Sequence, residues 1–235
     1  MRAHRVRALL MGGQACVFYG AAEFSRDTDL AIVADAANLA RLRQALSELQ
    51  ADVIAVPPLA LKHLRRGHAV HFRCQHPEAI RMRVDVMAKM RGVDPFPKLW
   101  KRRTTLELPD GTVCDLLSLP DLVQAKKTQR DKDWPMIRRL VEAHYFQNRA
   151  KPNPSQVRFW FRELRTPEIL IELAGSHGRL CHQLVAERPV LAEVVRNDRQ
   201  AIERALVAEE TAERENDREY WLPLRQELEQ LRHGK

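Results

Sequence analysis

Two glycines and two aspartates near the start of the chain have the types and spacing of a site that handles metal ions and phosphate. Gly12 and Gly13 are followed, after thirteen residues, by Asp27-Thr28-Asp29. Residues i and i+2 of a β-strand point to the same face and lie about 6 to 7 Å apart, so the two carboxylates could hold one or two divalent cations such as Mg²⁺, which prefer oxygen ligands. A glycine pair before a short helix lets backbone N–H groups approach a phosphate because no Cβ atom intervenes. Each motif alone is common in turns and loops, and only their order and spacing make the combination informative.

A third carboxylate follows at Asp85. Val84 and Val86 alternate with Arg83 and Asp85, which predicts a strand with one apolar and one charged face. If this strand lies beside the strand of Asp27, it completes a triad of carboxylates. The alternative is that Asp85 is an exposed strand residue that pairs with Arg83.

A sheet flanked by helices is needed to bring these residues together. Short apolar or alternating runs predict strands over residues 5–11, 30–34, 52–56, 69–74 and 82–87. Helical spacing is expected over residues 14–19 and 38–49. Pro109-Asp110-Gly111 separates two further strands, 105–108 and 112–116, and predicts a hairpin, because Asp-Gly tolerates positive φ.

The rest of the chain has a helical pattern. Helices are expected over residues 119–127 and 134–145, followed by a polar, proline-bearing boundary at 148–154. Beyond the boundary we expect a helix from residue 155, one capped by Thr166 with Pro167 in its first turn, a break at Gly175 and Gly178, one from Pro189 to about residue 208, and a last segment anchored by Trp221 and Leu224. The prediction is an α+β protein with a mixed, mostly antiparallel sheet in residues 1–148 and an all-helical region in residues 149–235.

The composition is that of a folded protein without membrane segments. The 235 residues are 45% hydrophobic and 30% charged, which argues against intrinsic disorder. No apolar run approaches the ~20 residues of a membrane helix, and residues 1–10 lack the apolar stretch of a signal peptide, so a cytoplasmic location without membrane contact is expected. The four cysteines form no CxxC pair, so neither a disulfide framework nor a zinc ribbon is expected.

The net charge of +8 is unevenly distributed along the sequence. Residues 1–150 carry 25 Lys and Arg against 16 Asp and Glu, whereas residues 151–235 carry 14 against 15. A localised excess of positive charge suits a polyanion such as nucleic acid or a nucleoside triphosphate. The alternative is a soluble surface with extra arginine.

Residues from about 5 to 140 resemble the nucleotidyltransferase superfamily, the DNA polymerase beta-like fold. The family pattern is Gly-Gly or Gly-Ser, then Asp-x-Asp, then a later third Asp, as in Gly12-Gly13, Ser25-x-Asp27-x-Asp29 and Asp85. Within the superfamily, Asp121-(x4)-Lys126 followed by Arg130-x-Lys132-Asp133 most resembles the bacterial minimal and abortive-infection type IV toxin group. The chain departs from many relatives in having Glu23 where they have an arginine, which bears on nucleotide binding more than on metal binding.

The resemblance implies a role for each matching residue. It implies that Asp27, Asp29 and Asp85 bind Mg²⁺ or Mn²⁺ and that Lys126 reaches the phosphates of the nucleotide. The residues that it places around the nucleotide are Gly12, Gly13, Ser25, Lys127 and Arg130. Asp133 would orient the lysine or the arginine through an ion pair. The structural alternatives are that Lys126 and Lys127 are a solvated helix face and that Asp121 is a helix N-cap.

The implied reaction is transfer of an NMP from an NTP to an acceptor hydroxyl, with release of pyrophosphate. RNA, above all a tRNA 3′ end, is the first expectation for the acceptor, since three basic runs supply charge that a small molecule would not need: Arg65-Arg66, Lys101-Arg102-Arg103 and Arg138-Arg139. An aminoglycoside or a protein hydroxyl is the second. A toxin that is neutralised by an antitoxin protein is one biological setting for such an enzyme. The alternatives in other classes are a catalytically idle nucleotide- or RNA-binding regulatory module and a general basic nucleic-acid binder.

Overall fold

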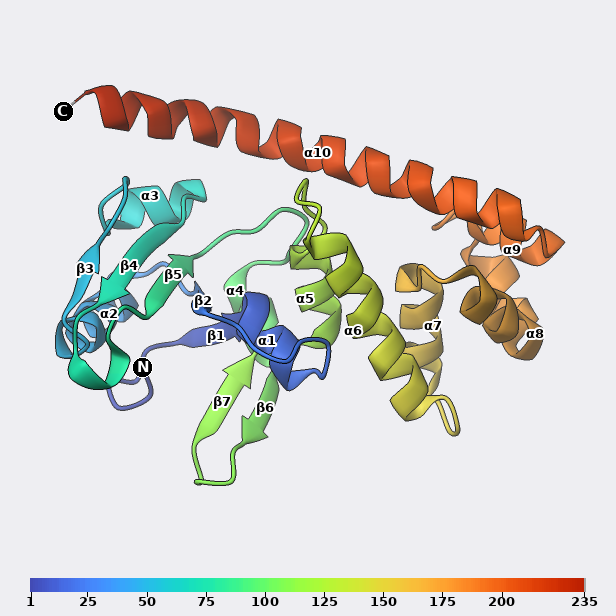
Figure 1. Ribbon diagram of the computed structural model, residues 1–235, viewed down its shortest axis with the longest axis horizontal. Coiled ribbons are helices and arrows are strands. Elements are labelled where there is room, and N and C mark those ends of the chain that lie inside the picture. Colours follow the sequence, from blue (N-terminus) through green and yellow to red (C-terminus); the bar gives the residue numbers. More distant parts are fainter. Residues whose placement is uncertain (235) are drawn as a thin grey trace. The chain divides into compact units, whose positions relative to one another are not determined.

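The fold is built on a seven-stranded mixed sheet (Figure 1). Asp27, Asp29 and Asp85 lie on two of its strands. The structure, a computed structural model, describes residues 1–234. The strands are β1 (Ala8–Met11), β2 (Asp27–Ile32), β3 (Ala51–Val53), β4 (Val70–Cys74), β5 (Arg83–Met87), β6 (Thr104–Glu107) and β7 (Val113–Leu116). They lie side by side in the order β3-β4-β5-β2-β1-β7-β6. The β2–β5 and β1–β7 pairs are parallel and the other four are antiparallel, which confirms an α+β protein with a mostly antiparallel sheet.

The chain divides into two compact units. Unit 1 comprises Met1–Ala125 and Glu219–Lys235, and unit 2 comprises Lys126–Arg218. Within unit 1 the sheet is accompanied by α1 (Gly12–Phe18), α2 (Ala36–Glu48), α3 (Leu61–Arg66), the 3-10 turn η1 (Pro77–Ala79), α4 (Phe96–Lys101) and α5 (Leu119–Ala125). Unit 2 is helical and comprises α6 (Asp133–Asn148), α7 (Pro154–Glu163), α8 (Pro167–Leu184), α9 (Leu191–Arg196) and the first part of α10 (Arg199–His233).

Alternation along the central strands separates an apolar face from a charged one. Leu30 and Ile32 of β2 and Val84 and Val86 of β5 belong to one buried cluster, which also contains the apolar side of α2 around Leu42. Because side chains alternate between the two faces of a strand, the residues between these positions point to the opposite face. The hydrophobic core on one side thus fixes which residues face the other side.

The N-terminal end of α2 ties the first strand to the core. Asp35 caps the helix by accepting a hydrogen bond of 2.7 Å from the backbone N–H of Asn38. The amide of Asn38 is buried and bonds the backbone N–H and C=O of Arg7 just before β1 and the C=O of Val33 just after β2. This buried amide therefore holds β1 and β2 in register beside the helix.

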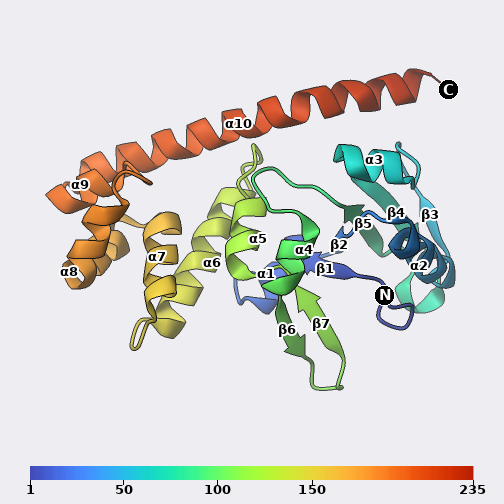
Figure 2. The same ribbon diagram turned by 180° about the vertical axis from the view of Figure 1, so that it is seen from behind.

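The predicted hairpin is confirmed at β6 and β7, and it projects from the sheet in both ribbon views (Figures 1 and 2). Gly111 has φ +79°, and the carboxylate of Asp110 accepts a hydrogen bond of 2.9 Å from the backbone N–H of Thr112. A glycine that adopts positive φ and an aspartate that accepts from the backbone two residues later are what make Asp-Gly favourable in a tight turn.

Several predicted element bounds are corrected by the structure. The strand expected over 30–34 begins earlier, at Asp27, so the acidic motif lies inside β2 and not ahead of it. The helix expected over 119–127 ends at Ala125, which leaves Lys126 and Lys127 outside it. The single helix expected from residue 189 to about 208 is instead two, because Asn197 adopts the left-handed conformation with φ +56° and ends α9.

The two predictions made for α8, a break near its glycines and a cap at Thr166, are each met only in part. The break expected near Gly175 and Gly178 is a kink at His177, whose φ and ψ of −132° and 37° are not helical. Thr166 precedes Pro167, as expected of a cap residue, but its side chain makes no capping hydrogen bond. Its hydroxyl donates to the carboxylate of Glu142.

The predicted boundary at 148–154 joins two helices that pack within unit 2. The ring centroids of Tyr145 on α6 and Trp160 on α7 are 5.0 Å apart, and Trp160 is fully buried. Asn153 and Gln156 form a capping box at the start of α7. Along the chain, the boundary of the compact units lies between Ala125 and Lys126 and again between Arg218 and Glu219. A folding domain that ends at residue 148 stays a prediction.

Among residues 1–234, no helix combines the length and the apolar character that crossing a membrane would require.

Candidate functional site

The pairing of β2 with β5 places two of the predicted carboxylates next to each other. In this parallel pair Asp29 is the partner of Asp85, and Asp27 is the partner of Arg83. Neighbouring strands lie about 4.8 Å apart, and aligned residues of a parallel pair point to the same face. The three aspartates therefore share the charged face of the sheet.

The glycine pair lies directly against this acidic motif. Gly12 and Gly13 are the first two residues of α1, which follows β1 without a loop. Met11, the last residue of β1, is the register partner of Asp29. A Cβ atom on Gly12 would lie 1.8 Å from Oδ2 of Asp29 and 2.7 Å from its Cβ. Only glycine allows this approach, and Gly12 also has φ +65°, a conformation that other residues rarely adopt.

Ser25 completes the contact between α1 and the acidic strand. A Cβ atom on Gly13 would lie 2.4 Å from the Ser25 hydroxyl oxygen. The same hydroxyl donates a 3.1 Å hydrogen bond to the backbone C=O of Asp27. The structure thus brings Gly12, Gly13, Ser25 and the β2 aspartates into one cluster, although the sequence separates them.

Asp85 is bound by two neighbours on the same face. Its Oδ1 lies 2.9 Å from Nε of Arg83 and 2.9 Å from Nδ1 of His71. Burial alone would raise the pKa of Asp85, but the hydrogen bonds from His71 and Arg83 outweigh it and hold that pKa below its usual range. The alternative interpretation, in which Asp85 pairs with Arg83, therefore describes a contact that the structure contains.

His71 is a residue of this cluster that sequence reasoning missed. The histidines 63, 68, 71 and 76 have a metal-like spacing, but on a predicted strand with period two His68 and His71 would fall on opposite faces, so joint metal binding is not expected. In the structure β4 begins at Val70, so His68 lies ahead of the strand. In the structure His71 is instead the antiparallel partner of Asp85 across β4 and β5. Only the strand order reveals this pairing, since no local pattern in the sequence links the two residues.

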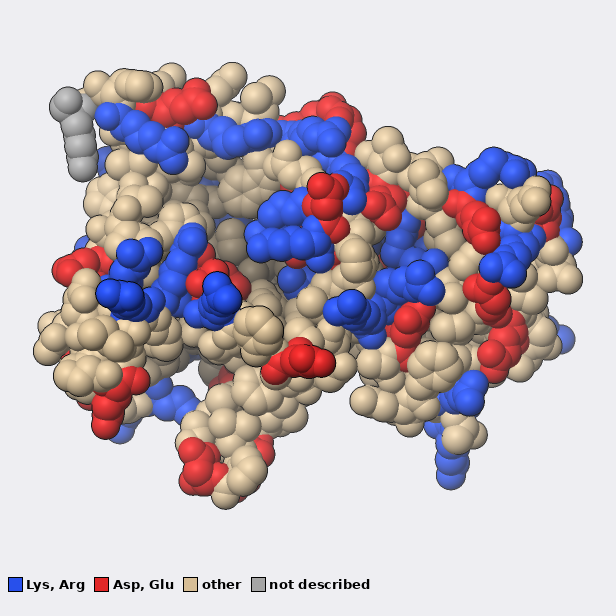
Figure 3. Space-filling view, in the orientation of Figure 1, with Lys and Arg blue, Asp and Glu red and all other residues tan. Residues whose placement is uncertain are grey.

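Two arginines, Arg73 and Arg83, border the acidic face on the side of β4 and β5. Arg73 on β4 is the register partner of Arg83 on β5 and is exposed. Figure 3 shows basic side chains beside acidic ones over these two strands. An anion that reaches the carboxylates would therefore pass a positive border, which lowers the electrostatic cost of bringing it there.

The acidic face has the ligand type that Mg²⁺ prefers, but its carboxylates are not gathered around one point. Among residues 1–234, no group of three or more His, Cys, Asp or Glu side chains is arranged to hold a metal ion. Both contacts of Asp85 end on Oδ1, so its Oδ2 is the oxygen that suits a metal. The donor set thus fits a hard cation in chemical type.

The other predicted site residues lie in unit 2 and are described separately. Lys126 is buried, and its Nζ lies 3.2 Å from Oδ1 of Asp133. Nε of Arg130 lies 2.7 Å from Oδ2 of the same aspartate, and Nζ of Lys127 lies 2.9 Å from the carboxylate of Glu163. The ion pair expected between Asp133 and the lysine or arginine is confirmed, whereas a solvated helix face for Lys126 and Lys127 is wrong.

Asp121 is not the helix N-cap that the structural alternative would make it. It lies within the first turn of α5, and the Ser118 hydroxyl accepts a hydrogen bond of 3.4 Å from its backbone N–H. Its carboxylate accepts two hydrogen bonds from the guanidinium of Arg102, of 2.7 and 2.6 Å. Asp121 thus anchors α5 to the segment after α4.

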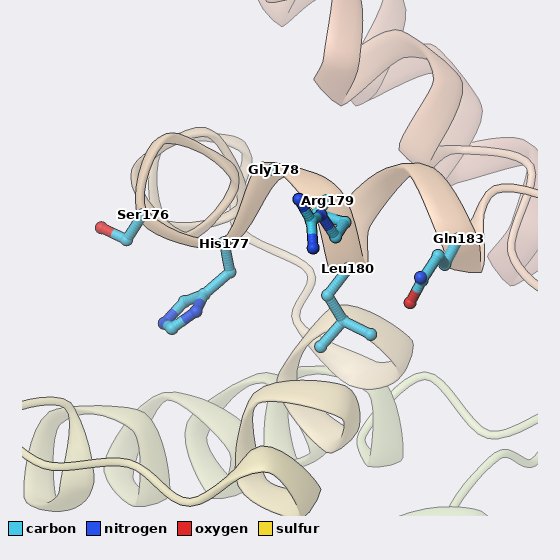
Figure 4. Close-up of a pocket in the computed structure, with 6 residues that line it drawn as sticks. All are labelled: Ser176, His177, Gly178, Arg179, Leu180 and Gln183. Atoms are coloured by element: carbon cyan, nitrogen blue, oxygen red, sulfur yellow. The ribbon is translucent and has the colours of Figure 1, made fainter.

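An open cleft of about 320 Å³ lies along α8 in unit 2. Its lining residues are Ser176, His177, Gly178, Arg179, Leu180 and Gln183. His177, Leu180 and Gln183 project to the same side of α8 (Figure 4). None of the predicted site residues lines this cleft.

No protein-family model matches the chain, and no curated protein sequence matches it significantly.

Proposed function

We propose that the chain is a metal-dependent nucleotidyltransferase with the nucleotidyltransferase fold, which transfers an NMP from an NTP to an acceptor hydroxyl. The observation that carries the proposal is the contact of Gly12 with Asp29 in the strand that pairs Asp29 with Asp85. It places a glycine turn, two carboxylates of one strand and a third carboxylate of the next strand on one face. Metal-assisted phosphoryl chemistry needs oxygen ligands and a backbone that a phosphate can approach.

The residues of the acidic face have distinct proposed roles. Asp27, Asp29 and Oδ2 of Asp85 would hold Mg²⁺ or Mn²⁺. A divalent cation bound there neutralises phosphate charge and makes the acceptor hydroxyl easier to deprotonate. A carboxylate must be ionised to bind a metal, and the low pKa of Asp85 keeps it ionised at neutral pH. Gly13 and Ser25 would border the triphosphate.

Lys126, Lys127 and Arg130 are proposed to bind the nucleotide phosphates. Each is paired with a carboxylate, and Lys126 is buried against Asp133. Binding of a phosphate by Lys126 therefore requires that the phosphate replace or share the contact with Asp133. The exposed side chain of Arg130 is the easiest of the three for a nucleotide to reach.

Asp29→Asn is expected to lower nucleotide transfer by about 100-fold or more, because it removes a charged ligand without changing the size of the side chain. The assay incubates the chain with each α-labelled NTP, Mg²⁺ and total cellular RNA and measures labelled product. Asp52→Asn, an exposed aspartate of β3, is the matched control and should retain full activity. Equal transfer by wild type and Asp29→Asn would remove Asp29 from the metal site.

RNA is the proposed acceptor class, with a tRNA 3′ end first, because of the basic border of the acidic face. An antitoxin protein is a proposed partner if such transfer is toxic. Labelled RNA in the assay supports this acceptor. Labelling of added aminoglycoside or protein instead of RNA would assign the transfer to those acceptors.

A catalytically idle nucleotide-binding module is the second candidate, and the contacts of Asp85 favour it. The guanidinium of Arg83 already neutralises this carboxylate and His71 contacts the same oxygen, as a permanent substitute for a metal would. Calorimetric titration of NTP with and without Mg²⁺ separates the two candidates. An enzyme should bind the NTP more tightly with Mg²⁺, whereas the idle module should show no metal-dependent binding.

A further inference from the structure

Two exposed phenylalanines flank the short segment that leads from α1 to the acidic strand. Phe18 and Phe24 are 37% and 70% exposed, and the third exposed phenylalanine among residues 1–234 is Phe146 in unit 2. Single apolar residues on a surface need no explanation. Phe18 and Phe24, however, both lie close in sequence to the candidate phosphate site, and packing in the core does not explain why these two positions are phenylalanine.

The segment between the two rings is fixed at both ends. At its start, the backbone N–H of Ala21 donates to Cys16 O at 2.9 Å, and Ala21 is buried. At its end, Ser25 bonds the backbone of Asp27 and packs against Gly13. Phe24 is therefore presented to solvent by a backbone that is already ordered, so a ligand would not have to order it on binding.

An exposed arginine, Arg26, follows Phe24 two residues later in the same segment. Arg26 is exposed and forms no ion pair within the part of the chain that the structure describes. Glu23, on the other side of Phe24, is exposed as well. An aromatic ring and a guanidinium are the two groups with which proteins bind single-stranded nucleic acid, the ring by stacking on a base and the guanidinium by pairing with a phosphate.

We propose that Phe24 and Arg26 bind a single-stranded RNA end, with the phenyl ring stacked on a base and the guanidinium on a backbone phosphate. The inference rests on the proposed function, since it places the acceptor beside the acidic face. The Cα atoms of Phe24 and Asp27 lie at most about 11 Å apart, the length of three extended residues. A base on Phe24 is thus close enough for the terminal hydroxyl of the same strand to reach the carboxylates.

The test measures binding of a fluorescent, short single-stranded RNA to the full chain by anisotropy, without NTP or added metal. Phe24→Ala is expected to weaken binding by about tenfold or more, because it removes a stacking platform. Phe24→Trp should keep RNA binding at the wild-type level or above, because it retains an aromatic platform. Arg26→Gln should weaken RNA binding and reduce its salt dependence. Glu23→Gln should strengthen binding by removing a repulsive charge.

Ile80→Ala is the matched control, since Ile80 is a 65% exposed apolar residue of the same unit. It should change the affinity by less than about twofold. Equal affinities of Phe24→Ala and Ile80→Ala, or a wild-type chain that binds no RNA, would overturn the proposal. The latter result would point to a protein partner for the exposed rings.

This assay is independent of the transfer assay. If RNA binding depends on Phe24 but the wild-type chain transfers no nucleotide, the RNA site stands and the proposed enzyme fails. If Asp29→Asn abolishes transfer while Phe24→Ala binds RNA normally, the enzyme stands and the RNA site fails.

Discussion

Gly12 is the residue on which the geometry of the acidic face depends most. Its missing side chain leaves room for the carboxylate of Asp29, and its positive φ turns the chain directly from β1 into α1. A methyl group there would collide with Cβ of Asp29 as well as with its carboxylate. A change of side-chain rotamer at Asp29 is therefore not enough to accommodate it, and β1 and β2 would have to move apart.

Gly12→Ala should lower the free energy of unfolding by about 3 kcal/mol, from the strained φ and the steric overlap together. Gly111→Ala is the control, because Gly111 has a similar φ of +79° but open space at the Cβ position. It should cost only the strain, about 1 kcal/mol. Urea denaturation measures both, and equal losses for the two variants would show that the contact with Asp29 is not tight.

At the residue scale, the sequence was enough to predict that Asp27 and Asp29 share one strand face and that Asp85 lies on the charged face of its own strand, whereas the pairing of the two strands comes from the structure. The alternation in residues 83–86 and the i, i+2 spacing of Asp27 and Asp29 depend only on the period of a strand. The contacts of Asp85 with His71 could not be predicted, because they depend on β4 being the neighbour of β5. Cross-strand register is a property of the sheet and leaves no local signal in either strand.

At the scale of elements, Asp133 connects the stretch after α5 to the start of α6. Its side chain is 3% exposed and accepts hydrogen bonds from Lys126, Thr128 and Arg130. Burial alone would raise the pKa of Asp133, but Lys126, Thr128 and Arg130 hold it below its usual range. Folding therefore stabilises the ionised carboxylate of Asp133 relative to the protonated one.

Asp133→Asn should lower the free energy of unfolding at neutral pH by about 3 kcal/mol, because it leaves the buried Lys126 without a counter-charge. Since folding depresses the pKa of Asp133, its contribution is present above the usual pKa of an aspartate, about 4, and is lost as the pH falls through the lower, folded-state pKa. The gap between wild type and variant should therefore close in acid.

The control is Asp131→Asn, since the side chain of Asp131 is 96% exposed although it pairs with Arg214. An exposed ion pair contributes at most about 1 kcal/mol, so this variant should resemble wild type at every pH. Denaturation curves at a series of pH values measure both. A gap for Asp133→Asn that does not change with pH would contradict the role of its charge.

Elements with a strong local signal were predicted to within a few residues, such as the Asp-Gly hairpin and the helix expected over residues 38–49, which is α2 (Ala36–Glu48). One error occurs where a single residue overrides a periodic pattern. Asn197 divides a helical run through its left-handed backbone, and no change in hydrophobic spacing marks it. Conversely, Pro223 lies inside α10 without ending that helix, although proline disfavours a helix interior.

At the scale of the whole molecule, the net charge divides differently when it is counted by compact unit instead of along the sequence. Unit 1 carries 21 Lys and Arg against 16 Asp and Glu, and unit 2 carries 18 against 15, so both are positive. Division at residue 150 assigns the whole excess to the first part because it counts residues 126–150 there, which carry seven Lys and Arg against three Asp and Glu and belong to unit 2. Residues 219–235 carry three of each sign and leave the balance unchanged. That residues 126–150 belong to the same compact unit as the later helices is a tertiary feature that composition along the chain does not show.

One helix, α10, contributes to the core of both units. Leu206 is buried within unit 2, where the backbone C=O of this residue accepts a hydrogen bond from Arg165. Leu224 is buried within unit 1, beside Gly67 at the end of α3. In the same unit, Glu227 accepts hydrogen bonds from Arg66 and His68.

This arrangement makes α10 a test of whether the units unfold separately. Leu→Ala substitutions at buried positions cost about 2 to 5 kcal/mol, and the loss should appear first in the unit whose core is damaged. Leu224→Ala should therefore reduce amide protection in α3 and β4, and Leu206→Ala should reduce it in α7 and α8. Hydrogen exchange followed by mass spectrometry measures both variants in the full chain. Because the two leucines lie on one helix, each variant is the control for the other, and equal loss of protection throughout the chain in both would mean that the two units unfold as one.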